Sequence, residues 1–192
     1  TKFAMPESAI GFFPDVGGSF FLSQLPNNIG KYIGLTGQVL EANELLYFGL
    51  ATEYFDFSKI DLIKEKFIND GFILSDKFEV NHESEIIKNI NLINKLFEGD
   101  IKNILSNIES NNSKFSKRTL DVLLKKCPMS LAITAKLIDD SKGKPLKDCL
   151  ETEFQLSQKI VYRDDFDNGI NSVLVSKDHD PKWNPSNIKD ID

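Results

Sequence analysis

The stretch MPESAIGFFPDVGGS, residues 5–19, carries two carboxylates in an otherwise apolar sequence rich in glycine and proline. Glu7 and Asp15 each follow a proline directly. Desolvation in such surroundings raises the pKa of a carboxyl group toward values that suit proton transfer, and two acids in one pocket can hold different protonation states. Gly17 and Gly18 allow a sharp entry into a helix, so we expect Asp15 near its positive end, held ionised. The stretch therefore predicts a site for acid–base chemistry.

The same two carboxylates also fit purely structural roles. Asp15 can act as a helix N-cap, and Glu7 can be a surface carboxylate at the end of a strand. The spacing alone does not show that the two groups meet, so both interpretations stay open at this level.

Composition limits the classes of protein and partner. The 192 residues are 41% hydrophobic and include 15 Phe, which is enough apolar surface for a packed core. The net charge of −6 argues against a nucleic-acid partner, because binding phosphates needs an excess of clustered cations. The apolar runs are far shorter than the ~20 residues of a membrane span. Cys127 and Cys149 lack a metal-type spacing, so we expect reduced thiols and no metal site.

Glycine and apolar periodicity divide the chain into two parts. Seven of the 11 glycines lie before residue 51, which predicts tight turns and close backbone approaches there. Apolar residues then recur at helical spacing, and a further helix is expected around Leu150, Phe154 and Leu156. The other expected helices cover 58–71, 86–97, 101–108, 120–124 and 129–138.

The predicted fold is mainly α, with one or two short strands near the N-terminus. Only Lys2–Met5 and Ala51–Phe55 have a strand pattern. Residues 1–55 are expected to form the end of a core that carries the carboxylates, and 56–192 a C-terminal helical region.

Motifs along most of the chain resemble one enzyme superfamily. They are Met5-Pro6-Glu7, the Gly-rich turn of residues 11–18, Leu35-Thr36-Gly37, Cys127-Pro128-Met129-Ser130-Leu131, Asp165-Phe166-Asp167-Asn168-Gly169 and residues 177–185. Together they resemble the crotonase (enoyl-CoA hydratase/isomerase) superfamily, and within it the 3-hydroxyisobutyryl-CoA hydrolase branch. The resemblance implies the C-terminal helical portion of an α/β crotonase-like fold.

The resemblance also implies roles for individual residues. Glu7 matches the catalytic glutamate of the superfamily. Asp15 stands where the hydratases usually carry glycine and the hydrolase branch carries a carboxylate. Lys177 and Lys182 match a tail that meets the phosphates of coenzyme A. No cofactor is implied, because coenzyme A is part of the acyl-CoA substrate.

The implied activity is hydrolysis of a CoA thioester in valine catabolism, in the mitochondrial matrix, with the cytoplasm or peroxisome as alternatives. Glu7 either attacks the acyl carbon or deprotonates a water that does, while Asp15 positions that water or the substrate's hydroxyl. One alternative is an enoyl-CoA hydratase/isomerase. Another is a noncatalytic helical interaction module, which Asn168 and Asn171 favour because the hydrolase branch tends to carry Glu and Arg there.

The resemblance implies that the family's first half, with its thioester-binding loops and oxyanion-hole donors, precedes Thr1. We expect that half to be a required partner and this chain alone to be inactive, since such donors supply much of the transition-state stabilisation. The apolar residues Phe12, Phe13, Phe20 and Phe21 are expected to form an uncovered face. The chain alone should therefore form a homo-oligomer or be unstable.

Overall fold

A computed structural model describes residues 1–71 and 76–191, which form two compact units. One unit contains Thr1–Phe3 and Leu40–Asn89, and the other contains Ala4–Val39 and the chain from Ile90 onward. The sequence analysis divides the chain between residues 55 and 56 by expected function, whereas these two units are defined by packing. The division at 55 and 56 therefore stays a prediction.

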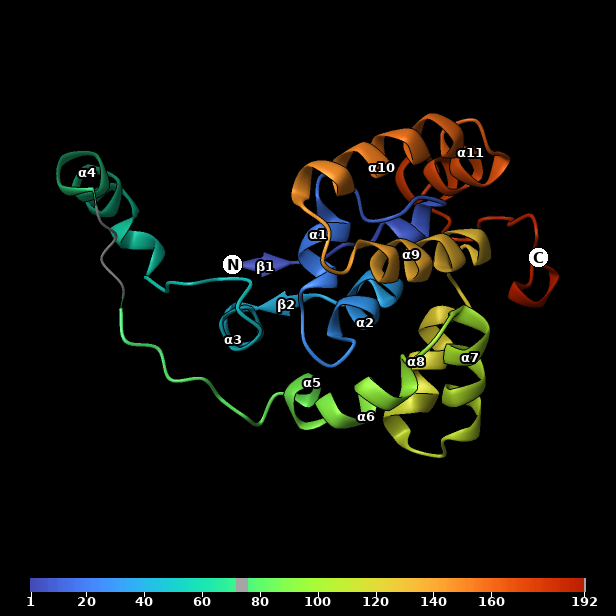
Figure 1. Cartoon of the computed structure of the whole chain (residues 1–192), viewed down its shortest axis with the longest axis horizontal. Coiled ribbons are helices and arrows are strands. Elements are labelled where there is room, and N and C mark those ends of the chain that lie inside the picture. The colour runs from blue at the N-terminus through green and yellow to red at the C-terminus, as the bar shows by residue number, and fades with distance from the viewer. Residues whose placement is uncertain (72–75, 192) are drawn as a thin grey trace. The chain divides into compact units, whose positions relative to one another are not determined.

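The first unit contains a two-stranded antiparallel sheet (Figure 1). Strands β1 (Lys2–Phe3) and β2 (Leu40–Glu41) pair with Lys2 opposite Glu41 and Phe3 opposite Leu40. The helices of this unit are α3 (Ala42–Tyr47), η2 (Phe57–Lys59), α4 (Ile60–Asp70) and α5 (Glu85–Lys88).

Two expectations for this part of the chain are wrong. Residues 51–55 form no strand, because the N–H groups of Leu50 and Ala51 both donate to the Leu45 carbonyl and turn the chain back on the end of α3 (2.9 and 3.0 Å). The helix expected over 86–97 is interrupted at Asn89. The Asn89 side chain donates to the carbonyl of Glu85 at 2.8 Å, a local bond that competes with continued helix.

The regular elements of the second unit are all helices in the described residues. Its elements are η1 (Glu7–Ile10), α1 (Gly18–Ser23), α2 (Ile29–Thr36), α6 (Ile90–Leu96), α7 (Ile101–Ser110), α8 (Lys114–Leu123), α9 (Pro128–Ser141), α10 (Leu146–Ile160), α11 (Asp164–Ile170), η3 (Asn171–Val175) and η4 (Ile188–Asp190). Helix α9 packs against α1 and α2 (Figure 1). The mainly α fold with one short sheet is thus confirmed.

The aromatic face expected to lie uncovered is partly packed: Phe13 is buried, Phe12 and Phe20 are half-buried and Phe21 is exposed. Phe13 is fully buried against Leu137 of α9 and Ile160 of α10, and Phe12 packs on the same cluster. Phe21 remains 49% exposed. The expectation fails for Phe13 because helices from late in the sequence cover the turn that follows η1.

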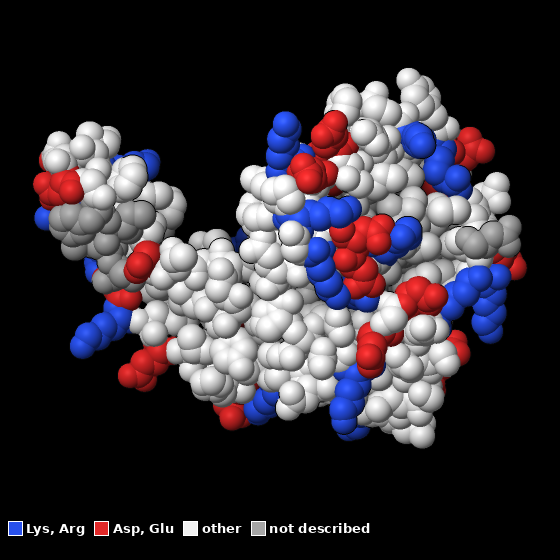
Figure 2. Space-filling view, viewed as in Figure 1, with Lys and Arg blue, Asp and Glu red and all other residues white. Residues whose placement is uncertain are grey.

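The charged surface and the thiols add little chemistry of their own. On the face shown in Figure 2, acidic and basic side chains lie next to one another. Cys127 and Cys149 are buried free thiols. Within the described residues, no group of three or more His, Cys, Asp or Glu could hold a metal ion, and no helix has the length and apolar character to cross a bilayer.

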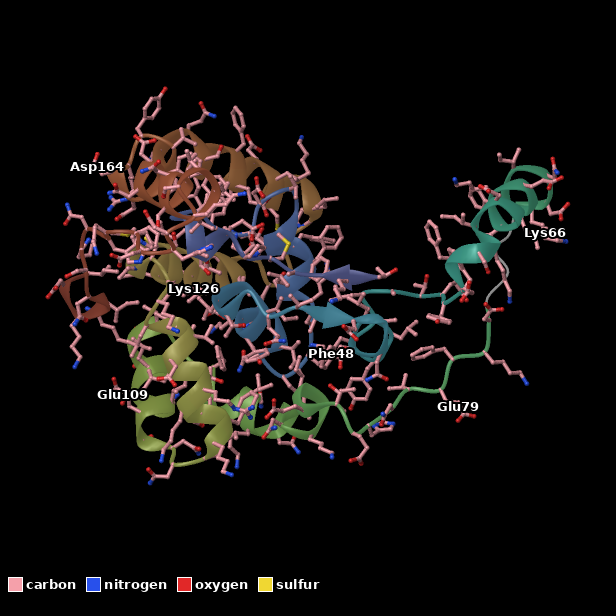
Figure 3. The ribbon with its side chains drawn as sticks, turned by 180° about the vertical axis from the view of Figure 1, so that it is seen from behind. Phe48, Lys66, Glu79, Glu109, Lys126 and Asp164 are labelled. Atoms are coloured by element: carbon pink, nitrogen blue, oxygen red, sulfur yellow. The ribbon has the colours of Figure 1, made fainter. Side chains whose placement is uncertain are left out.

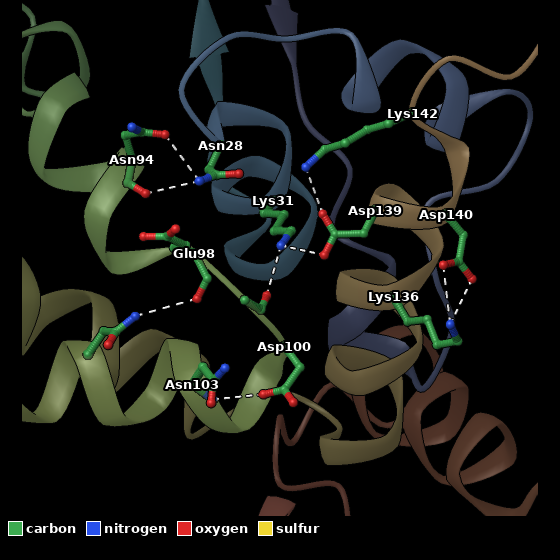
Figure 4. A network of polar contacts seen from close by, with 12 residues as sticks. Asn28, Lys31, Asn94, Glu98, Asp100, Asn103, Lys136, Asp139, Asp140 and Lys142 are labelled. Atoms are coloured by element: carbon green, nitrogen blue, oxygen red, sulfur yellow. Dashed lines mark hydrogen bonds and ion pairs between the residues drawn. The ribbon is translucent and has the colours of Figure 1, made fainter.

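A buried lysine joins α2 to two other elements of this unit. The ammonium group of Lys31, only 2% exposed, lies 2.6 Å from a carboxylate oxygen of Asp139 on α9. It also donates to the Gly99 carbonyl before α7, at 2.8 Å (Figure 4). An ammonium group removed from water must keep such partners, so Lys31 fixes these three segments together.

Replacement of Lys31 should therefore destabilise the protein. Lys31→Ala leaves the Gly99 carbonyl and one carboxylate oxygen of Asp139 without this donor. We expect the variant to lower the free energy of unfolding by about 2 to 3 kcal/mol in urea denaturation. Lys136→Ala is the control, because Lys136 forms an exposed ion pair with Asp140 and its loss should cost less than about 1 kcal/mol. Equal effects of the two variants would contradict the account.

Candidate functional site

The first sequence-predicted carboxylate, Glu7, begins the short helix η1, which is tied to two other elements. The Ser8 hydroxyl donates to the Leu35 carbonyl near the end of α2, at 3.1 Å. The Ser8 carbonyl accepts from the N–H of Cys127 just before α9, at 3.0 Å. Because Ser8 is fully buried, these bonds hold the backbone beside Glu7 in a fixed place.

Two glycines bring η1 against α11. A Cβ atom added to Gly11 would lie 2.4 Å from the Asp165 carbonyl oxygen, and one added to Gly169 would lie 2.4 Å from the backbone of Ile10. Gly11 also has a φ of +75°, a conformation that other residues rarely adopt. The site thus requires glycine at both positions.

The carboxyl group of Glu7 is partly withdrawn from water. Its Oε2 atom is buried and has no hydrogen-bond partner among the described residues. Burial raises the pKa of Glu7 from 4.5 to about 7, its own backbone N–H opposes the rise, and the charge of Asp15 adds to it. The charge of Asp15 thus acts on Glu7, and the pKa of Glu7 suits the exchange of a proton near neutral pH.

The second carboxylate, Asp15, differs from expectation in its electrostatics. Burial raises the pKa of Asp15, its own backbone N–H lowers it, and the charge of Glu153 raises it. The start of a helix therefore does not lower the pKa of Asp15, and that Asp15 is held ionised stays a prediction. The N–H groups of Gly17 and Ser19 at the start of α1 donate to Glu153, and the N–H of Gly18 donates to the backbone carbonyl of Asp15, so these donors do not serve the Asp15 side chain.

Glu153 is a buried acid that the sequence reasoning missed. One carboxylate oxygen accepts from the N–H of Gly17 at 2.8 Å. The other accepts from both the N–H and the hydroxyl of Ser19, at 2.9 and 2.5 Å. The residue is 3% exposed, so these three bonds to the turn that follows Asp15 stabilise its charge in place of water.

Helix α10 is present as expected, but two of the apolar residues that located it in the sequence are not on its buried face. Leu150 and Phe154 are 41% and 65% exposed, whereas Cys149, Glu153 and Ile160 are buried. Positions 149, 153, 156 and 160 follow helical spacing. A signal for Glu153 was therefore present in the sequence, since an acid on a buried apolar stripe marks a specific partner.

The C-terminal tail is tied to α11 through another missed acid. Asp165, 2% exposed, accepts from the Arg163 side chain at 2.9 Å and from the N–H of Asn184 at 2.6 Å. Lys177 and Lys182 lie on this tail and are exposed, and Lys182 pairs with Asp180 at 2.5 Å. Within the described residues, no hydrogen bond or ion pair joins either lysine to Glu7 or Asp15.

A pocket of about 540 Å³ lies between α7, the α8–α9 junction and η4, and neither Glu7 nor Asp15 lines it. Lys126, labelled in Figure 3, is one of its lining residues. Burial lowers the pKa of Lys126. The pocket is thus separate from the paired carboxyl groups.

Comparison with known proteins places the chain in a family. The family model described as "Enoyl-CoA hydratase/isomerase" matches residues 1–192. The chain belongs to this family. Two solved structures of similar fold are an enoyl-CoA hydratase from Rhodobacter sphaeroides and a carnitinyl-CoA dehydratase from Mycobacterium thermoresistibile. Their TM-scores are 0.90 and 0.86, with 25% and 26% identity, and each match covers 100% of this chain and 56% of the other.

Curated relatives from this enoyl-CoA hydratase/isomerase family carry a more specific name. The chain is 32% identical to the mitochondrial 3-hydroxyisobutyryl-CoA hydrolase of Bos taurus, over 98% of this chain and 53% of that protein. It is 36% identical to the protein of the same name from Dictyostelium discoideum, over 100% of this chain and 54% of that protein. The chain spans about half the length of the curated relatives it matches.

The raised pKa of Glu7 predicts a pH-dependent cost in stability. Between about pH 4.5 and 7 the unfolded chain releases a proton from Glu7 that the folded protein keeps, so stability falls as pH rises. Glu7→Gln removes this cost because glutamine does not ionise. At about pH 8 we expect the variant of the full-length protein to be more stable than wild type by about 1 to 3 kcal/mol, discounted for partial exposure.

The measurement is urea unfolding of both proteins at about pH 4 and about pH 8. At the acid pH the difference should shrink, because Glu7 is then protonated in both states. Glu109→Gln on α7, an exposed position, is the control and should show no comparable change. A Glu7→Gln variant that is no more stable at the higher pH would show that Glu7 is not desolvated.

Proposed function

We propose that the full-length protein hydrolyses a CoA thioester, with 3-hydroxyisobutyryl-CoA as substrate. The observation that carries the proposal is the partly buried carboxyl of Glu7, with a pKa of about 7 and the carboxyl of Asp15 close by. The names of the curated relatives support the choice of substrate. Their mitochondrial location also supports a mitochondrial site of action for this protein.

The proposed reaction breaks the bond between the acyl carbon and sulfur. In the general-base route, Glu7 takes a proton from water, the water oxygen bonds to the acyl carbon, and the departing CoA thiolate takes the proton back. In the nucleophilic route, a Glu7 oxygen bonds to the acyl carbon and CoA leaves as the thiolate. Water then hydrolyses the resulting anhydride. Both routes end with a free acid, CoA and unchanged Glu7.

The environment of Glu7 suits either route. A base with a pKa near the working pH is ionised in a large fraction of molecules and still binds a proton strongly. Asp15 is proposed to orient the attacking water or the substrate's hydroxyl group. The reaction needs no further cofactor, because coenzyme A is part of the substrate.

The C-terminal tail is proposed to contact coenzyme A. Lys177 and Lys182 are exposed cations on the tail, which suits contact with phosphate groups. Asn168 donates to the Lys182 carbonyl at 3.1 Å, so it supports the tail through its amide group in place of a charge. The residues that complete the thioester site are proposed to come from the family's other half.

An enoyl-CoA hydratase is the second candidate, because one of the similar solved structures is an enoyl-CoA hydratase. Asp15 favours the hydrolase, since a second carboxyl group beside Glu7 can orient a water or hydroxyl for attack at a carbonyl carbon. Product analysis separates the two: release of free CoA supports the hydrolase, and hydration of crotonyl-CoA without CoA release supports the hydratase.

Substitution of the two carboxylates should abolish most of the activity. In the full-length protein, we expect Glu7→Gln to lower kcat for CoA release from 3-hydroxyisobutyryl-CoA by about 10² to 10⁴-fold, the usual contribution of a general acid or base. Asp15→Asn should lower kcat by about 10 to 10²-fold through lost positioning. Glu109→Gln is the matched control, and activity near wild type in both site variants would overturn the proposal.

Chemical trapping should separate the two routes. If Glu7 is the nucleophile, hydroxylamine added during turnover converts the anhydride into a hydroxamate on Glu7, which mass spectrometry of the peptide detects. Under the nucleophilic route we expect the hydroxamate in the wild-type protein. Under the general-base route we expect it in neither the wild type nor Glu7→Gln. Glu7→Gln serves as the control, because it cannot form the anhydride.

A further inference from the structure

The turn that follows Asp15 is held by a side chain that is distant in the sequence. Glu153 lies 136 positions along the chain from Gly17, and its carboxylate closes three hydrogen bonds onto the backbone and side chain at Gly17 and Ser19. Helix α10, which supplies Glu153, runs alongside α1 (Figure 1). No other bond between side chain and backbone reaches this turn within the described residues.

The three bonds have a geometry that a neutral side chain cannot reproduce. Gly17 and Ser19 present donors to both carboxylate oxygens, so Glu153 must act only as an acceptor. A glutamine would accept at one end and direct an N–H group at a donor at the other. The residue is also buried, so water cannot take over the missing bond.

Resting on the proposed function, we propose that Glu153 is the positioning residue for Asp15. Its carboxylate fixes the turn after Asp15, and its negative charge stands beside the Asp15 carboxyl group. It does not touch the substrate in this account. It acts by setting where the Asp15 oxygens lie and how readily they bind a proton.

The charges around Asp15 come from a small set of elements. Glu153 on α10 raises the pKa of Asp15, and Glu7 on η1 interacts with it. Helix α1 contains no titratable side chain, and α9 meets this turn through the apolar contact of Leu137 with Phe13. No lysine or arginine among the described residues contributes to the pKa of Asp15.

The test measures the pKa of Asp15 directly in the full-length protein. Carboxyl-carbon NMR titration should give an Asp15 pKa above its usual value in wild type and a lower one in Glu153→Gln, because the neighbouring charge is removed. The same variant should lose about 10 to 10²-fold in kcat with a much smaller change in KM. Glu151→Gln, an exposed acid on the same helix, is the control and should change neither quantity.

The outcomes are distinguishable from failure of the proposed function. An unchanged Asp15 pKa in Glu153→Gln would overturn the inference, whatever the activity. If the pKa falls but kcat is unchanged in Glu153→Gln and is lowered in Asp15→Asn, the inference is overturned and the function stands. If Asp15→Asn is also fully active, it is the proposed function that falls.

A second variant keeps the test usable if Glu153→Gln does not fold. Ser19→Ala removes one of the three bonds and leaves the charge of Glu153 in place. We expect a drop of about threefold to tenfold in kcat, with the Asp15 pKa still raised, because the turn is loosened while the charge remains. Wild-type kcat in Ser19→Ala would contradict the positioning role.

Discussion

The backbone contact between η1 and α11 is the constraint on which the site depends. Gly11 and Gly169 each sit where a single added carbon would overlap the backbone of the other element. Backbone atoms cannot move aside as a flexible side chain can, so this approach fixes η1 against the tail-bearing helix. That contact and the hydrogen bonds made by Ser8 fix the position of Glu7.

Within this frame, three acids are arranged so that their negative charges repel one another. Glu7 is desolvated, Asp15 interacts with it, and Glu153 interacts with Asp15. Only Glu153 has its carboxylate fully bonded to donors. The protein gives up stability to hold a carboxyl group partly out of water, and this is the kind of cost that active sites impose on a fold.

Local patterns in the sequence predicted the features that neighbouring residues determine, such as helices and turns. The helical periodicity predicted the mainly α fold, and the Pro-Glu pair and Gly-rich turn singled out Glu7 and Asp15 as the candidate carboxylates. Glu153 was missed because its partners lie far along the chain, 136 positions away for Gly17. Asp165 was missed because its bond to the N–H of Asn184 spans 19 positions, although its other partner, Arg163, is two positions away. The strand expected at 51–55 failed for a local reason, since the N–H of Ala51 donates to the Leu45 carbonyl in α3.

We propose that Glu7 and Asp15 converge on one acyl group. A crystal structure of the full-length protein with a non-hydrolysable analogue of 3-hydroxyisobutyryl-CoA tests this arrangement. We expect a Glu7 oxygen within about 3.5 Å of the acyl carbon and an Asp15 oxygen within hydrogen-bond distance of the acyl group or its hydroxyl. An acyl group bound away from both carboxylates would contradict it.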